Sequence, residues 1–159
     1  MILVQLDISK AFDTMHIDSF LQYFKDHWSA CTAKSASLLR WFLTHSRLRV
    51  QLFDKTWWCQ QQWGTQQGGS HSPTLFGRVV AGRFQSLARK WREKGENSAF
   101  QSSGLFLWGL WFIDDATLLF RNSAQLSRLL PEVLSLLADM GLAVNVSKSC
   151  LFGLHLPRS

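Results

Sequence analysis

The chain opens on a run of apolar residues that shows no polar alternation. Ile2 to Ile8 is apolar on both faces and rich in β-branched residues, which predicts a buried strand in the centre of a sheet. Two further apolar runs, Leu105 to Ile113 and Ala116 to Phe120, flank Asp114 and Asp115. We expect these runs to form a hairpin with the two acids at its turn. Because the first strand begins almost at residue 1, we expect the chain to be a piece of a longer protein.

Capping residues and apolar side chains at helical spacing predict the helices. They are expected to begin at Asp18 or Ser19, at about Ser35, at Ser72–Pro73 and at Ser123. The last of them contains Pro131 and is expected to end at Gly141, with a kink or a late start at the proline.

The remaining strands are predicted from alternation and from turn residues. Leu48 to Leu52 alternates apolar and polar residues, and together with Thr56 to Trp58 it predicts a second hairpin. Short closing strands are expected at Val144 to Val146 and at Cys150 to Leu154. The order of elements favours an α+β fold, in which an antiparallel sheet is backed by helices.

Composition and charge narrow the class of protein. The 159 residues, 47% hydrophobic and 18% charged, suit one globular domain. The net charge of +6 fits a polyanionic partner, but equally an ordinary basic protein. Three scattered cysteines, Cys31, Cys59 and Cys150, indicate neither a disulfide framework nor a zinc site, which favours an intracellular protein in the nucleus or the cytoplasm. No apolar run approaches the ~20 residues that span a bilayer, so we expect no membrane association.

Acidic residues at the ends of apolar strands are the first candidates for chemistry. If the strands are neighbours, Asp7, Asp114 and Asp115 converge at one edge of the sheet. Carboxylates that share a site repel one another unless a cation joins them, and Mg²⁺ prefers such oxygen ligands. Two ions ~3.5–4 Å apart would hold both oxygens of a phosphoryl transfer. From the residues alone, the Asp-Asp pair could also be a plain turn, and Asp7 or Asp13 could cap a helix.

Four segments in a fixed order carry a family resemblance. They are Leu6–Asp13 (Leu-Asp-Ile-Ser-Lys-Ala-Phe-Asp), Gly64–Phe76 (a Gly, a Gln-Gly pair and a Ser-Pro-Thr-Leu-Phe helix start), Phe112–Asp115, and Gly141–Leu142 with Asn145 and Lys148. They resemble the palm motifs of reverse transcriptases, in the form of non-LTR retrotransposons and group II introns. The resemblance covers nearly the whole chain. It implies a reverse transcriptase domain over residues 1–159, with a ferredoxin-like palm over about residues 1–154.

The resemblance also assigns roles to residues. It implies that Asp7 and Asp114 are the main metal ligands, with Asp115 beside them and the carbonyl of Ile8 as a further ligand. It places Phe12 under the sugar of the incoming nucleotide, where a large ring excludes a 2′-hydroxyl; the alternative is that Phe12 belongs to the core. Gln67 and Gly68 would contact the nucleotide. Lys148 would lie near the leaving pyrophosphate, although a lysine at a strand end is usually just solvated.

The implied reaction is RNA-directed DNA synthesis with Mg²⁺, or Mn²⁺ as the alternative ion. The implied partners are an RNA template, a DNA primer and deoxynucleoside triphosphates. Fingers and thumb are expected to lie outside this chain, in a longer polyprotein, so the isolated chain is expected to be inactive. Two rivals stay open. One is a catalytically inactive nucleic-acid-binding remnant of a mobile element, and the other is an RNA-templated RNA polymerase, against which Phe12 argues.

Overall fold

The structure of the chain is a computed structural model that describes residues 1–27, 33–45, 47–60, 64, 72–102, 105–112 and 114–153. Its helices are α1 (Ala11–Thr14), α2 (Ile17–His27), α3 (Ala33–Thr44), α4 (Ser72–Glu93) and α5 (Ser123–Asp139). Its strands are β1 (Ile2–Ser9), β2 (Arg47–Leu52), β3 (Lys55–Gln60), β4 (Phe100–Ser102), β5 (Leu105–Leu107), β6 (Gly109–Phe112), β7 (Asp115–Phe120), β8 (Ala143–Val144) and β9 (Cys150–Gly153).

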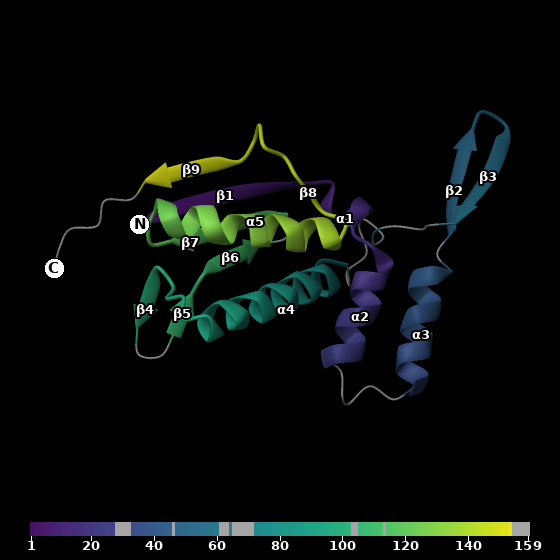
Figure 1. Cartoon of the computed structure of the whole chain (residues 1–159). Coiled ribbons are helices and arrows are strands. Elements are labelled where there is room, and N and C mark those ends of the chain that lie inside the picture. Colours follow the sequence, from purple (N-terminus) through teal and green to yellow (C-terminus); the bar gives the residue numbers. More distant parts are fainter. Residues whose placement is uncertain are drawn as a thin grey trace.

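A five-stranded antiparallel sheet organises the molecule, with β1 at its centre (Figure 1). Its order is β6-β7-β1-β8, and β9 also pairs with β1, along the same edge as β8. With α4 and α5, the strands β1, β6, β7 and β8 follow the β-α-β-β-α-β order of a ferredoxin-like fold. The expected α+β class, with an antiparallel sheet backed by helices, is therefore confirmed.

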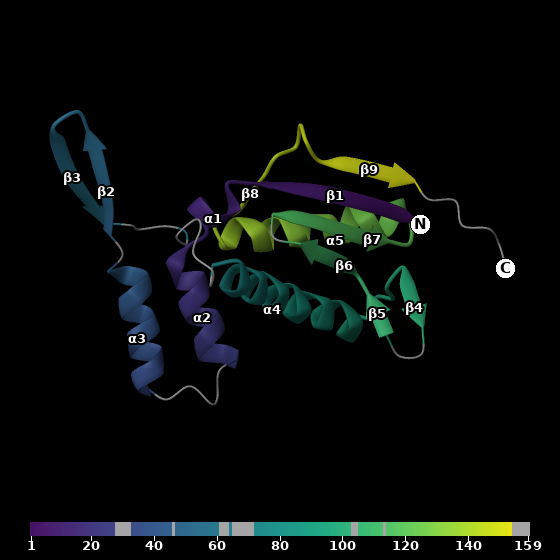
Figure 2. The ribbon, with the colours of Figure 1, turned by 180° about the vertical axis from the view of Figure 1, so that it is seen from behind.

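One face of this sheet is covered and the other is open. The side chains that point to the covered face are buried, as the period of two requires: Val4, Leu6 and Ile8 on β1, and Ala116, Leu118 and Phe120 on β7. Helices α4 and α5 lie on that side (Figures 1 and 2). On the other face, Gln5 and Asp115 are exposed, and so are Leu110 and Phe112 of β6. The sheet therefore presents an open surface at which Asp7 and Asp115 lie.

The helices fill the core with large apolar residues. Phe76, Val79, Val80 and Trp91 of α4 are almost completely buried. Burying each such side chain contributes about 1.5–3 kcal/mol, so α4 contributes strongly to the core under the sheet. Gly82 lets α2 approach α4, because a Cβ at that position would overlap the ring of Tyr23.

The expected strand from Leu105 to Ile113 is interrupted. Trp108 separates β5 from β6, and its side chain is only 4% exposed. Its indole packs against that of Trp91 at a centroid distance of 5.0 Å, while its carbonyl accepts a hydrogen bond from the N–H of Leu119 at 2.8 Å. The apolar run therefore belongs to two hairpins, β4–β5 and β6–β7.

The start of α5 also differs from expectation. Asn122, and not Ser123, is the N-cap, and its side-chain oxygen accepts a hydrogen bond from the N–H of Gln125 at 2.9 Å. Pro131 lies inside the helix, so the late start at the proline is wrong.

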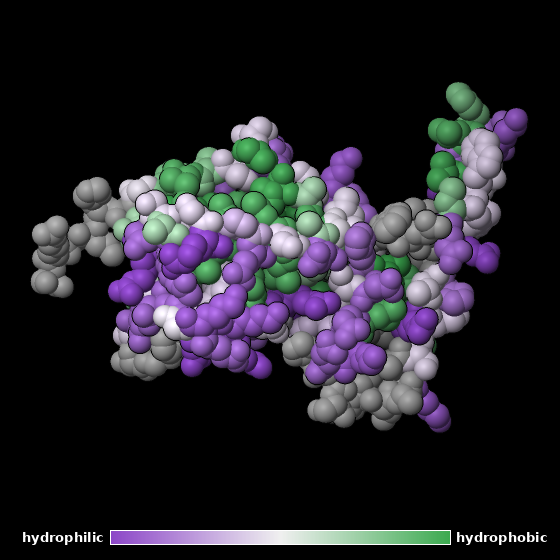
Figure 3. Space-filling model, in the orientation of Figure 1, coloured by the Kyte–Doolittle hydropathy of each residue, from purple (hydrophilic) through white to green (hydrophobic). Residues whose placement is uncertain are grey.

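Strands β2 and β3 form a hairpin that projects from the body of the molecule next to α3 (Figure 1). Hydrophobic and hydrophilic residues lie side by side on it (Figure 3). Within the described residues, none of the helices combines the length and the apolar character needed to span a membrane.

Candidate active site

Asp7 and Asp115 lie directly opposite each other on neighbouring strands. The antiparallel register of β1 and β7 pairs their Cα atoms, so both side chains point to the open face of the sheet. Directly opposite residues have Cβ atoms roughly 4.5–5.5 Å apart. Asp7 is half-buried and Asp115 is exposed. The structure therefore brings together two of the three acids that the sequence singled out.

Asp114 lies in the turn that precedes β7, against the end of β1. Its carbonyl oxygen accepts a hydrogen bond from the N–H of Ile8 at 2.9 Å, and its side chain is exposed. The turn of the β6–β7 hairpin is thus fastened to the residue that follows Asp7. All three acids lie at the same end of the sheet.

The three acids do not form a closed set of metal ligands. Among the residues that the structure describes, no three His, Cys, Asp or Glu side chains are gathered closely enough to hold a metal ion by themselves. Mg²⁺ is usually held by one or two carboxylates together with water and substrate phosphates, and not by a cage of protein groups. The pair formed by Asp7 and Asp115 fits this kind of ligand set.

The backbone of Asp7 is held by the turn between β8 and β9. The N–H of Asp7 donates to the hydroxyl of Ser149 at 3.2 Å, and the N–H of Asn145 donates to the carbonyl of Asp7 at 2.8 Å. The same Ser149 hydroxyl donates to the carbonyl of Asn145 at 2.8 Å. The sequence pointed to Asn145 but not to Ser149, since a serine in a polar turn carries no distinguishing signal.

Lys148 lies in this same turn. Its N–H donates to the carbonyl of Asn145 at 3.2 Å, and its side chain is exposed. The turn therefore puts a cation beside the strand end that carries Asp7. Ile8, the expected carbonyl ligand, is buried with 2% exposure.

Phe12 lies on α1, the short helix that follows β1 directly. Its ring packs against Phe76 of α4 at a centroid distance of 5.1 Å, and the side chain is half-buried. The side chain is therefore neither fully enclosed by the core nor fully exposed. It is compatible with a core role and with a contact to a substrate.

Gly64 holds the start of the glycine- and glutamine-rich loop against α1. Its N–H donates to the carbonyl of Met15 at 2.8 Å, its φ is 75°, and a Cβ would overlap the carbonyl oxygen of Phe12. Only glycine meets both conditions without strain. Gln67 and Gly68 lie outside the described residues. Ser72, the next described residue, is buried at the start of α4.

The sequence matches the family described as reverse transcriptase (RNA-dependent DNA polymerase) over residues 1–155. The chain belongs to the reverse transcriptase family. Members of this family are RNA-directed DNA polymerases, which are nucleotidyltransferases. Comparison with curated proteins gives no match.

Solved telomerase structures share the fold of this reverse transcriptase chain. The apo telomerase of Candida tropicalis, truncated from the C-terminal domain, is similar with a TM-score of 0.70 and 15% identity, over 99% of this chain and 31% of that one. Telomerase of the same species in complex with the TWJ fragment of telomeric RNA has a TM-score of 0.69 and 13% identity, over 95% of this chain and 26% of that one. Telomerase of Candida albicans in complex with that RNA fragment has a TM-score of 0.61 and 11% identity, over 96% of this chain and 28% of that one. The reverse transcriptase chain thus spans about a third or less of these proteins.

Proposed function

We propose that this chain supplies the catalytic palm of an RNA-directed DNA polymerase. The reaction is attack of a primer 3′-hydroxyl on the α-phosphate of a deoxynucleoside triphosphate, which releases pyrophosphate. The register that sets Asp7 opposite Asp115 on the open face carries the proposal, because it aims two carboxylates at one place on a surface that no helix covers.

The chain's own part in this reaction is to position charge. Asp7 and Asp115, with Asp114 in the adjoining turn, provide oxygen ligands for divalent cations, Mg²⁺ or Mn²⁺ as the alternative. Two such cations, when bound, would lower the charge on the triphosphate and activate the attacking hydroxyl. The hydrogen bonds that the Asp7 N–H donates to Ser149 and that its carbonyl accepts from Asn145 fix the backbone of Asp7, so the carboxylate keeps its place on the rigid sheet.

The neighbouring residues receive roles by their places around these acids. The half-buried ring of Phe12 would lie against the sugar and exclude a 2′-hydroxyl, which selects deoxynucleotides. Gln67 and Gly68, which follow Gly64 in the second motif, would contact the nucleotide. Lys148 would neutralise charge on the departing pyrophosphate, and the carbonyl of Ile8 would complete a metal's ligands.

The motifs also suggest an origin for the chain. The helices α1, α2 and α3 and the β2–β3 hairpin lie between Asp7 and the second motif. A segment of this length resembles the non-LTR retrotransposon and group II intron branch, and we propose that the chain comes from such an element. The similarity to telomerase structures supports the fold but does not identify the branch of the reverse transcriptase family. Fingers and thumb, an RNA template and a DNA primer would complete the enzyme.

The proposal is tested by metal and nucleotide binding to the chain itself. Mn²⁺ is titrated with and without a deoxynucleoside triphosphate and followed by electron paramagnetic resonance. We expect the nucleotide to tighten Mn²⁺ binding, and Asp7→Asn or Asp115→Asn to abolish that gain. Asp139→Asn, an exposed acid at the end of α5, is the control. Binding that survives Asp7→Asn and Asp115→Asn would refute the assignment.

A catalytically inactive nucleic-acid-binding remnant is the second candidate. The basic side chains exposed along α4, among them Arg78, Arg89 and Lys90, suit a phosphate backbone whether or not catalysis occurs. Such a remnant would bind nucleic acid but show no nucleotide-dependent gain in Mn²⁺ affinity, so the same titration separates the two.

A further inference from the structure

The hairpin formed by β2 and β3 is exposed over almost its whole length. Every residue of the two strands whose side chain is described is exposed, including Trp57 at 45% and Trp58 at 65%. An isolated two-stranded ribbon is marginally stable in water, so exposed aromatic residues on it call for a ligand or partner.

The register divides the ribbon into two unlike faces. One face, which we call the basic face, holds the cross-strand pairs Arg47–Gln60, Arg49–Trp58 and Gln51–Thr56. The guanidinium of Arg49 donates to the side-chain oxygen of Gln51 at 3.4 Å, which shows that these residues share a side. The opposite face carries the pairs Val50–Trp57 and Leu52–Lys55. The basic face thus combines two cations, amide and hydroxyl groups, and one large accessible ring.

Aromatic and cationic groups continue from the basic face onto α3. The side-chain amide of Gln60 donates to the carbonyl of Thr44 at 2.8 Å and so ties the ribbon to the end of the helix. There Trp41, 58% exposed, stacks on the exposed His45 at a centroid distance of 5.4 Å. Arg40, on the same turn of the helix, is exposed as well.

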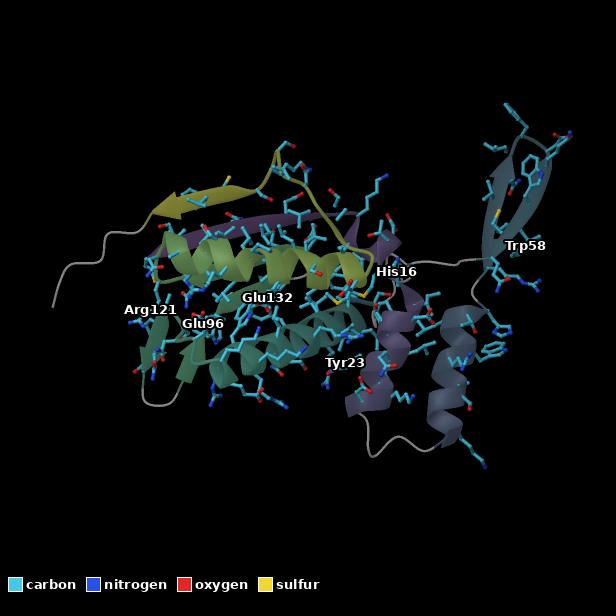
Figure 4. The ribbon with its side chains drawn as sticks, in the orientation of Figure 1. His16, Tyr23, Trp58, Glu96, Arg121 and Glu132 are labelled. Atoms are coloured by element: carbon cyan, nitrogen blue, oxygen red, sulfur yellow. The ribbon has the colours of Figure 1, made fainter. Side chains whose placement is uncertain are left out.

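We propose that the basic face of the β2–β3 hairpin binds single-stranded nucleic acid. An exposed ring beside arginines matches a strand's unstacked bases and its phosphates. A duplex hides its bases from such stacking. None of the residues of the basic face is acidic. This site is separate from the acids of the sheet: Trp58 lies out on the ribbon, away from the body of the molecule (Figure 4).

The test is fluorescence anisotropy of labelled oligouridylate and oligothymidylate, about ten nucleotides long, with chelator present. Without divalent cations, the result does not depend on the proposed polymerase function. We expect Trp58→Ala to weaken binding about 5- to 100-fold, the range found for loss of one stacked base. Trp58→Phe should restore most of it. Trp57→Ala, on the opposite face, should leave affinity within about twofold and serves as the matched control.

The salt dependence of nucleic-acid binding tests the role of the Arg47 and Arg49 side chains. Loss of two phosphate contacts in the double variant Arg47→Gln, Arg49→Gln should lower the slope of log affinity against log salt by about 1.4, at about 0.7 per contact for single strands. The control Arg89→Gln, Lys90→Gln on α4 removes the same charge elsewhere and should change the slope less. A difference in affinity between the RNA and the DNA probe shows which of the two nucleic acids the hairpin binds.

Three results would overturn the proposal. One is equal loss on Trp57→Ala and Trp58→Ala, which means that the ribbon has merely lost its structure. Another is unchanged binding in both Trp58→Ala and the double variant Arg47→Gln, Arg49→Gln. The third is that these variants change only the self-association of the chain, measured by sedimentation, which would make the hairpin a protein–protein contact.

Discussion

At the scale of single residues, the site depends on backbone hydrogen bonds to Asp7 more than on contacts of its carboxylate. Its N–H and its carbonyl are both engaged by the turn between β8 and β9, through Ser149 and Asn145. In the proposed metal site, this carboxylate has to stay accessible to cations and a triphosphate. Its position is therefore set through the main chain, and this makes Ser149 a positioning residue.

Replacing Ser149 tests this arrangement. Ser149→Ala leaves the partly buried N–H of Asp7 without its acceptor, so we expect a loss of about 1 kcal/mol in the free energy of unfolding, measured by urea titration. Weaker nucleotide-dependent Mn²⁺ binding should accompany it. Ser147→Ala is the control, because the Ser147 hydroxyl is exposed and bonds to Asn145 Oδ1 at 2.7 Å, away from Asp7. Equal effects of the two variants would remove the positioning role.

At the scale of elements, helix packing decides how closely α2 lies to α4. Gly82 faces the ring of Tyr23, where a Cβ would collide, whereas a Cβ at Gly77 in the same helix meets nothing within 4 Å. The two glycines therefore differ only in what lies opposite them.

Alanine at these two positions should act in opposite directions. Gly77→Ala should raise the free energy of unfolding by about 0.5–1 kcal/mol, because alanine loses less conformational freedom in a helix. Gly82→Ala should lower it by about 1–3 kcal/mol through overpacking against Tyr23. Urea denaturation of both variants measures the difference. Stabilisation by both would show that α2 is not packed on Gly82.

A polar network joins the end of α4 to the start of α5. The guanidinium of Arg128 donates to Glu96 at 2.7 Å and the amide of Gln125 donates to it at 3.1 Å (Figure 4 labels Glu96). These hydrogen bonds, that from Arg128 first, hold the pKa of the Glu96 carboxyl below its ordinary value. The network adds stability only while that carboxyl is ionised.

The pH dependence follows from the sign of this shift. A lowered pKa in the folded state stabilises the protein above the unfolded pKa of about 4.3, and the gain is lost as pH falls through the folded value. Glu96→Gln should therefore lower the melting temperature at pH 7, and the gap to the wild type should close below about pH 4. Thermal denaturation followed by circular dichroism at several pH values measures it. A gap that does not change with pH would contradict the assignment.

The sequence predicted those elements whose signal is local. Pro73 after Ser72 marks the start of α4, and the apolar runs of β1 and β7 are unmistakable. It missed the interruption at Trp108, because apolar residues continue on both sides and only burial against Trp91 distinguishes the two strands. It also chose Ser123 over Asn122 as the cap of α5. Both residue types cap helices, and the choice depends on where the preceding strand ends.

The candidate site was predictable only in part. That Asp7 and the Asp-Asp pair share one end of the sheet follows from acids placed at strand ends. Which of the pair faces Asp7 depends on register, since a shift of one residue moves a side chain to the other face. In the structure, Asp115 lies opposite Asp7, whereas the carbonyl oxygen of Asp114 accepts a hydrogen bond from the N–H of Ile8.

At the scale of the whole molecule, many apolar side chains of the described residues remain exposed. They lie on the open face and edge of the sheet and on the β2–β3 hairpin, among other places, and include Leu110, Phe112, Phe152, Phe53 and Trp57. Patches of this kind mark contacts with other domains or with ligands.

The chain alone should therefore self-associate and fail to extend a primer. Template affinity depends on many phosphate contacts, most of which we assign to fingers and thumb outside this chain. Purified residues 1–159 should show large species by light scattering and no primer extension with Mg²⁺ or Mn²⁺. Robust extension that disappears on Asp114→Ala would show that the palm suffices.

The central place of β1 also governs when the protein can fold. The strand is made well before its partners, since Ile2 pairs with Phe120 and with Gly153. During synthesis at ~5–20 residues per second, the apolar segment from Ile2 to Ile8 waits roughly 5–20 s for β7 to emerge from the ribosome. An unpaired strand of this composition is prone to aggregate. The emerging chain should thus rely on chaperones throughout that interval, and Asp7 and Asp115 become neighbours only after β7 has emerged.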